Sequence, residues 1–165
     1  MEIKITFCLP RDAASAPVSR QLLDACLDVL GVSPETRTDI ALAMGEACAN
    51  VIQHACAGDE YEVRAGVVDG RCVIEVVNAG PGMKAAPVGD PGPGAEHGRG
   101  LQIIDAVAEN LRLTGRSQAG TTLHFEKVLR WLPDAAGGLL FGDLTAPPAA
   151  SRPGPASPGG TGPRS

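Results

Sequence analysis

The sequence predicts a two-layer α/β (α+β) sandwich. In it, three helices cover one face of a mixed, mostly antiparallel sheet of about five strands. The first observation is the order of periodic segments, which is strand, helix, helix, strand, strand, long loop, helix, strand, strand. The second is a two-residue hairpin signal, Asp69-Gly70. The third is that the repeating strand–helix–strand pattern of a doubly wound fold is missing.

The first third of the chain predicts one strand followed by two helices. Residues 3–9 alternate apolar and polar side chains, which is typical of a strand. Residues 13–31 carry apolar residues at helical spacing and end at a glycine. Ser33-Pro34-Glu35 then provides a capping side chain, a proline at the first helical position and an acid in the first turn. The second helix is expected to run to about His54 or Cys56.

The remaining elements follow from turn signals and a change of composition. Residues 60–77 are two β-runs joined by Asp69-Gly70, and therefore predict a hairpin. Residues 78–98 are rich in glycine and proline and predict a long loop. Residues 99–109 predict a short helix, and residues 110–116 and 121–130 predict two further strands.

The chain divides into three regions of different composition. Residues 1–132 are expected to form the folded domain, a length that suits a modest core. Residues 133–142 are expected to act as a connector. Residues 143–165 contain six prolines and four glycines, with few apolar side chains to offset the entropy of ordering. We therefore expect a disordered tail.

Composition argues against several classes of protein. The formal net charge is -5, from 14 Lys+Arg and 19 Asp+Glu, and no basic stripe is present, so direct nucleic-acid binding is not expected. No apolar run approaches the roughly 20 residues of a membrane helix. Residues 1–4 show no basic region followed by an apolar core, so a secretory signal is not expected. The five cysteines include no CxxC pair, which favours buried or half-buried small side chains over disulfides or zinc. These features predict a cytoplasmic protein without a membrane partner.

The second predicted helix carries a polar line of residues. Glu46, Asn50 and His54 are four residues apart and share one side of the helix. A carboxylate and a carboxamide one turn apart suit a proton acceptor and an oxygen ligand for Mg²⁺. On helical spacing alone, an exposed polar face of an amphipathic helix is the favoured interpretation.

Two glycine clusters flank the long loop. An apolar strand, residues 73–77, runs into Asn78-x-Gly80-x-Gly82, where a ligand could approach the backbone closely. After the loop, Gly98-Arg99-Gly100-Leu101 opens a helix, where free amides and the helix dipole favour a phosphate. Each cluster alone is more often a turn. The order of the two glycine clusters along the chain, after the helix that carries Glu46, is a more specific indication of a nucleotide site than either cluster alone.

Residues 3–130 resemble the histidine-kinase-like ATPases in the order of these motifs. The pattern Glu46-Ala47-x-x-Asn50-x-x-x-His54-Ala55 is similar in detail to that of the anti-sigma factor serine kinases. The resemblance implies that the chain binds ATP and Mg²⁺, with Glu46 as the catalytic base and Asn50 as the magnesium ligand. His54 belongs to the matching stretch, but we assign it no role and favour its interpretation as a neutral packing histidine. The other implied site residues are Asn78, Gly80, Gly82 and Thr122 around adenine, residues 83–97 as the ATP lid, and Gly98, Arg99, Gly100 and Leu101 around the phosphates.

One position departs from the pattern of these ATPases. Asn78 stands where the family usually has an aspartate, which accepts a hydrogen bond from the exocyclic amine of adenine. The amide of Asn78 still offers an oxygen but no charge. Because a charge-assisted bond is about twice as strong as a neutral one, the loss is about 1–2 kcal/mol, or roughly tenfold in affinity.

Other nucleotide and metal motifs fit poorly. The chain contains no Gly-x-x-x-x-Gly-Lys-Ser/Thr, which excludes a P-loop. The cluster Gly94–Gly100 follows a loop rather than a first strand, which disfavours a Rossmann dinucleotide site. No His-x-x-x-His or Cys/His cluster indicates a zinc hydrolase.

Two functions remain. The resemblance implies a homodimeric serine/threonine protein kinase that sequesters a sigma factor and phosphorylates an anti-anti-sigma (STAS-type) protein, controlling transcription by partner switching. The alternative is a non-catalytic or weakly nucleotide-binding module of the same fold, which acts by sequestering its partner.

Overall fold

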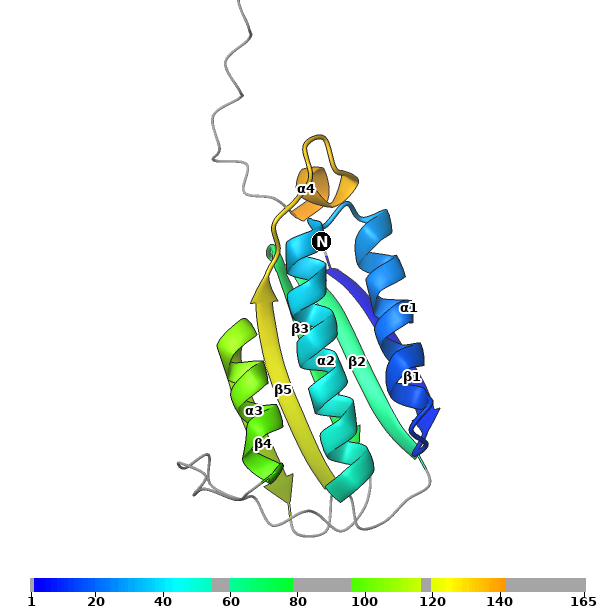
Figure 1. Ribbon diagram of the computed structural model, residues 1–165. Helices are drawn as coiled ribbons and strands as arrows, with labels where there is room; N and C mark the ends of the chain where they lie inside the picture. Colours follow the sequence, from blue (N-terminus) through cyan, green and yellow to red (C-terminus); the bar gives the residue numbers. More distant parts are fainter. Residues whose placement is uncertain (1, 55–59, 79–95, 117–119, 142–165) are drawn as a thin grey trace, which may run out of the picture.

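The computed structural model describes residues 2–54, 60–78, 96–116 and 120–141 (Figure 1). The elements in chain order are β1 (Glu2–Pro10), α1 (Ser15–Val29), α2 (Pro34–His54), β2 (Glu60–Val68), β3 (Arg71–Asn78), α3 (Glu96–Val107), β4 (Glu109–Arg116), β5 (Gly120–Val128) and α4 (Ala136–Phe141). The predicted order is confirmed, and the short helix α4 is added to it.

The five strands form one sheet in the order β1-β2-β3-β5-β4. Each neighbouring pair of strands is antiparallel. The described strands therefore form a fully antiparallel sheet rather than the mixed, mostly antiparallel sheet that was expected. The predicted hairpin joins β2 to β3. Asp69 and Gly70 both have positive φ, 46° and 73°, as a two-residue turn between twisted strands requires.

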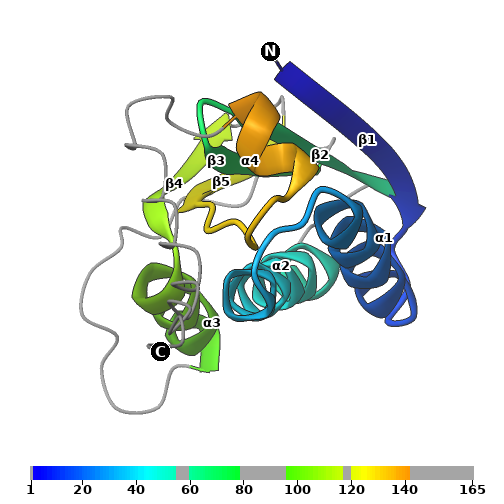
Figure 2. The same ribbon diagram turned by 90° about the horizontal axis from the view of Figure 1, so that it is seen from above.

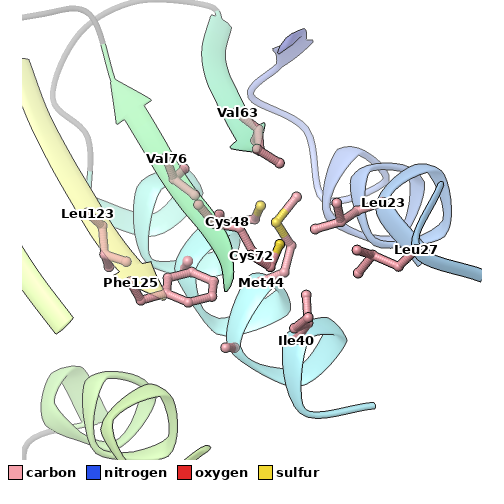
Figure 3. Packing of buried hydrophobic residues seen from close by; sticks show 14 of the residues in the cluster. Leu23, Leu27, Ile40, Met44, Cys48, Val63, Cys72, Val76, Leu123 and Phe125 are labelled. Carbon is pink, nitrogen blue, oxygen red and sulfur yellow. The ribbon is translucent and has the colours of Figure 1, made fainter. Parts of the chain in front are cut away.

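Helices α1, α2 and α3 lie side by side on one face of the sheet, with α2 in the middle (Figures 1 and 2). This arrangement confirms the predicted two-layer sandwich. Alternate residues of each strand point toward the helices and form the core with the buried stripes of α1 and α2. Figure 3 shows Met44 and Ile40 of α2 between Leu27 of α1 and Phe125 of β5.

The start of α2 follows the expected capping pattern. The backbone amide of Thr36 donates to Ser33 Oγ at 3.4 Å, and the two hydroxyl oxygens are 3.0 Å apart. Gly31, with φ of 79°, turns the chain between α1 and α2. Arg37 then pairs with Asp28 at 2.5 Å and with Asp24 at 3.6 Å, which fixes one flank of α2 against α1.

Helix α4 lies within the segment expected to be a connector. The rings of Trp131 and Phe141 stack with centroids 6.3 Å apart, and the amide of Gly137 donates to Leu30 O at 2.9 Å. The amide of Leu132 donates to Gly31 O at 2.8 Å. Residues 131–141 therefore pack on the turn between α1 and α2 instead of leaving the domain. The sequence Ala136–Phe141 is too short to show helical periodicity.

The described cysteines are free thiols, and the structure divides them by burial. Cys48 and Cys72 lie in the core, where burial raises the pKa of both thiols, that of Cys72 to about 12. Cys8 and Cys26 are exposed, so the expectation of burial is wrong for these two. No helix in the described ranges has the length and apolar character needed to cross a membrane.

Candidate functional site

The carboxylate of Glu46 lies against the second turn of α3. A Cβ atom placed on Gly100 would be 3.0 Å from Glu46 Oε2 and 3.9 Å from Glu46 Cβ. Glycine at position 100 therefore lets α3 approach the carboxylate closely. The side of α2 that carries Glu46 faces α3, whereas Gly45 contacts Arg20 of α1. The interpretation of Glu46 as part of a freely exposed polar face is wrong, because α3 partly covers it.

Lys127 of β5 ties the two helices together on the same flank. Its ammonium group lies 2.8 Å from Asp39 Oδ2 of α2 and donates to the carbonyl oxygen of Val107, the last residue of α3. A cation at this position also suits the negative end of the helix dipole. Lys127 thereby fixes the C-terminal end of α3 near α2, about two turns from the contact between Glu46 and Gly100.

Asn50 lies one helical turn beyond Glu46 and is half-buried like it. Side chains four residues apart in a helix share one flank, so the carboxamide of Asn50 follows the Glu46 carboxylate along the side of α2 that faces α3. The predicted pair is therefore kept together. It presents one carboxylate and one amide oxygen next to α3.

Asn78 is the last residue of β3, and its side chain is 1% exposed. Like Ile74 and Val76, it occupies the sheet face covered by helices. Neither Asn78 Oδ1 nor Nδ2 has a hydrogen-bond partner among the described residues. Directly opposite on β5 is Thr121, which is 6% exposed and whose hydroxyl also has no such partner. Buried polar groups are normally bonded, so this pair is a candidate ligand position at the strand ends.

Thr122 does not join this pair. It lies opposite Val77 on β3 and Thr114 on β4, and it alternates with the buried residues Thr121 and Leu123. Successive side chains of a strand point to opposite faces, so Thr122 belongs to the face without helices. The structure thus places Thr121, rather than the predicted Thr122, on the helix-covered face beside Asn78. The alternation that buries Leu123 and Phe125 was a sufficient signal for this choice.

The start of α3 also differs from the expectation. The helix begins at Glu96 rather than residue 99, so Gly98 lies in the first turn, whose amides have no partner within the helix. Gly100 lies in the second turn, where its described feature is the contact with Glu46. Arg99 is exposed, and Leu101 is partly buried against the core.

Several predicted residues fall outside the description. Gly80, Gly82 and residues 83–95 of the expected lid lie outside the described residues, and the side chain of His54 does as well. A separate hollow of about 370 Å³ lies over β1, β2 and β3. Its lining includes Lys4, Arg64, Gly66 and Glu75, and none of the predicted site residues.

The described residues fit a purine nucleotide with a divalent cation. The uncommitted amide and hydroxyl at Asn78 and Thr121 suit the polar edge of a base. Gly98 lies in the first helical turn, which favours phosphate, and Asn50 offers an amide oxygen of the type that Mg²⁺ accepts. Glu46 adds a carboxylate beside this helix start.

Residues 9–127 match the family described as the histidine kinase-like ATPase domain. This match spans most of the chain, which therefore belongs to that family, and the predicted resemblance is confirmed. Within it, the chain is similar to serine-protein kinase RsbW of Bacillus licheniformis, with 28% identity over 125 residues, or 68% of this chain and 77% of that protein.

A solved structure agrees with the fold. The crystal structure of the RsbU and RsbW domains of Rv1364c from Mycobacterium tuberculosis superposes with a TM-score of 0.61 at 21% identity. The match covers 77% of this chain and 32% of that one, so the present chain corresponds to about a third of the larger protein.

Proposed function

We propose that this chain is an ATP-binding anti-sigma regulatory factor of the cytoplasm that acts as a serine/threonine protein kinase on an anti-anti-sigma (STAS-type) partner. The observation that carries the proposal is the contact of Glu46 with Gly100 of α3, on the helix-covered side that also buries Asn78. The membership of the ATPase family and the similarity to a serine-protein kinase support it.

In this proposal, each site residue has one chemical task. Bound ATP and Mg²⁺ supply the transferable phosphoryl group and neutralise the charge that develops on it. Glu46 orients the serine hydroxyl of the partner and accepts its proton. Asn50 offers its amide oxygen to the cation, and Gly98 offers its backbone amide to phosphate. Asn78 and Thr121 contact the base.

The proposed partners come with the family rather than with a surface of this chain. The protein would form a homodimer and bind a sigma factor. It would release the sigma factor when the unphosphorylated anti-anti-sigma protein competes for binding to this chain. Phosphorylation of that competitor would restore sequestration and so control transcription. The similarity to RsbW supports this arrangement.

The alternative is a partner-sequestering module with weak or no phosphotransfer. The observation that favours it is Asn78, an uncharged residue at the position where these ATPases usually carry aspartate. Nucleotide binding by the purified full chain, with and without Mg²⁺, separates the two functions. Magnesium-dependent ATP binding supports the kinase, whereas binding that occurs only after Asn78→Asp supports the module.

Phosphotransfer tests the chemistry directly. Proteins captured by the full chain are incubated with radiolabelled ATP, and label on a serine of the captured partner is measured. Glu46→Ala is expected to lower the rate by about 10²–10⁴-fold. Glu35→Ala, which changes an exposed carboxylate in the first turn of the same helix, serves as the matched control and is expected to keep the rate. Transfer that survives Glu46→Ala would refute the assigned base.

A further inference from the structure

The amide of Asn78 is buried yet uncommitted. Its side chain is 1% exposed, and both its oxygen and its nitrogen lack a hydrogen-bond partner among the described residues. Its neighbours on the same face of β3 and β5 include Val76 and Leu123, which are apolar and cannot fix the orientation of the amide. Thr121 opposite carries a hydroxyl that donates or accepts equally well.

A carboxamide presents one donor group and one acceptor side by side. A half-turn about the Cβ–Cγ bond exchanges them with little change in shape. A 6-aminopurine such as adenine offers a donor at its 6-amino group and an acceptor at N1. A 6-oxopurine such as hypoxanthine offers an acceptor at O6 and a donor at N1. The Asn78 amide therefore complements either edge with two hydrogen bonds.

A carboxylate at the same position would behave differently. It only accepts hydrogen bonds, so it would favour the 6-amino group and repel O6 of a 6-oxopurine. A site with a fixed pattern of hydrogen-bond donors and acceptors strongly rejects an analogue with the opposite pattern, because a buried polar group is then left unpaired.

We propose that Asn78 makes this site accept 6-oxopurine nucleotides as well as ATP. The inference rests on the proposed function, which places the base against Asn78. Thr121 supports both purine classes through its rotatable hydroxyl. The site thus recognises purine nucleoside triphosphates in general, because residue 78 no longer distinguishes an amino group from an oxygen at position 6 of the base.

Inosine triphosphate is the sharpest probe, because it differs from ATP only at N1 and C6 of the base. We would titrate the full chain with each nucleotide in the presence of Mg²⁺ by calorimetry. The dissociation constants for ITP and ATP are expected to agree within about tenfold for the natural chain. In Asn78→Asp, the ITP constant is expected to exceed the ATP constant by at least about a hundredfold.

A second, uncharged variant keeps the test valid if the Asn78→Asp protein does not fold. Asn78→Ala removes both polar atoms and is expected to weaken ATP and ITP by similar factors, with their ratio unchanged. A natural chain that prefers ATP as strongly as Asn78→Asp does would overturn the inference and leave the proposed function intact. A ratio that rises in Asn78→Ala would also overturn it. If neither nucleotide binds the natural chain or any variant, the proposed function fails as well.

Discussion

Glu46 and Gly100 lie more than 50 residues apart in the sequence, on two different helices, and each limits the side chain that the other position tolerates. The carboxylate of Glu46 occupies the space that a side chain at position 100 would need. A helix normally favours alanine over glycine by about 1 kcal/mol, so a glycine inside α3 is explained by this contact rather than by helix stability.

Gly100→Ala separates catalysis from stability. The new Cβ would meet the mobile end of the Glu46 side chain, which can move, so we expect the melting temperature to be unchanged or raised. The displaced carboxylate should slow phosphotransfer by about 10–100-fold. Thermal unfolding and the rate of transfer to the captured partner measure the two effects.

The double variant supplies the control for this prediction. If Gly100→Ala acts only through the carboxylate, it should have no further effect on transfer in a Glu46→Ala background. Equal losses in both backgrounds would mean that Gly100 acts independently of Glu46.

At the scale of elements, the position of α3 depends on contacts at both of its ends. Gly100 meets Glu46 near its start, and the carbonyl of Val107 accepts a hydrogen bond from Lys127 at its end. Lys127 also pairs with Asp39, so one side chain of β5 joins α2 to α3.

Lys127→Met should loosen α3 selectively. We expect the free energy of unfolding to fall by about 1 kcal/mol, because an ion pair and a hydrogen bond to a helix end are lost. Amide hydrogen exchange should accelerate in α3 more than in α1. Lys4→Met is a suitable control, since Lys4 is exposed, pairs with Glu2 on the edge strand β1, and should change stability by less than about 0.5 kcal/mol. Equal effects of both variants on α3 would contradict this account.

Helix α4 provides two neighbouring glycines with opposite expectations. A Cβ on Gly137 would lie 2.0 Å from Trp131 Cζ3 and 2.6 Å from the carbonyl oxygen of Leu30, whereas one on Gly138 would lie no closer than 3.3 Å to Trp131. Gly137→Ala should therefore lower the free energy of unfolding by about 1–3 kcal/mol. Gly138→Ala should change it by less than about 1 kcal/mol. Urea denaturation of both variants checks the packing of α4, and similar midpoints would show that α4 does not pack in this way.

At the scale of the whole molecule, the sheet has one face covered by helices and one face that carries charged side chains. On the second face, Glu126 of β5 accepts a hydrogen bond from Asn110 at 3.0 Å and lies 3.4 Å from Arg71 and 3.3 Å from His124. The hydrogen bond from Asn110 is the largest cause that lowers the pKa of Glu126, and His124 and Arg71 add to it. This carboxylate links strands β3, β4 and β5.

The lowered pKa of Glu126 gives a pH dependence with a defined sign. A group whose pKa is depressed in the folded state stabilises the fold above its ordinary pKa of 4.5, and this contribution is lost as the pH falls through the folded value. Glu126→Gln should be less stable than the natural chain by about 1 kcal/mol at pH 7. Below the folded pKa the difference should disappear. Denaturation of both proteins across this pH range tests it, and a difference independent of pH would contradict the assignment.

Much of this architecture follows from local patterns in the sequence. The hairpin at Asp69-Gly70 and the start of α2 at Ser33 depend on neighbouring residues alone, and both are predicted correctly. The family is also predicted, since its motifs keep their order along the chain. Helix α4 was missed because its stability comes from Trp131 and Leu30 rather than from its own periodicity.

The site is predicted less completely than the fold. Glu46 and Asn50 follow from helical spacing, but their contact with α3 depends on how two distant helices pack. The motif Gly120-Thr121-Thr122 does not state which threonine faces the helices, although the alternation of Thr121 with Leu123 and Phe125 along β5 does. Burial of Asn78 with both amide atoms unpaired is visible only in three dimensions.

Residue-resolved NMR of the full chain, during titration with a non-hydrolysable ATP analogue and Mg²⁺, tests the nucleotide site directly. We expect the resonances of the Asn78 side-chain amide and of the Gly98 and Gly100 backbone amides to shift together and to saturate at the same nucleotide concentration. The proposed nucleotide site would be contradicted if these three resonances stayed unchanged and the chemical-shift changes instead affected residues around Lys4 and Arg64, on the opposite face of the sheet.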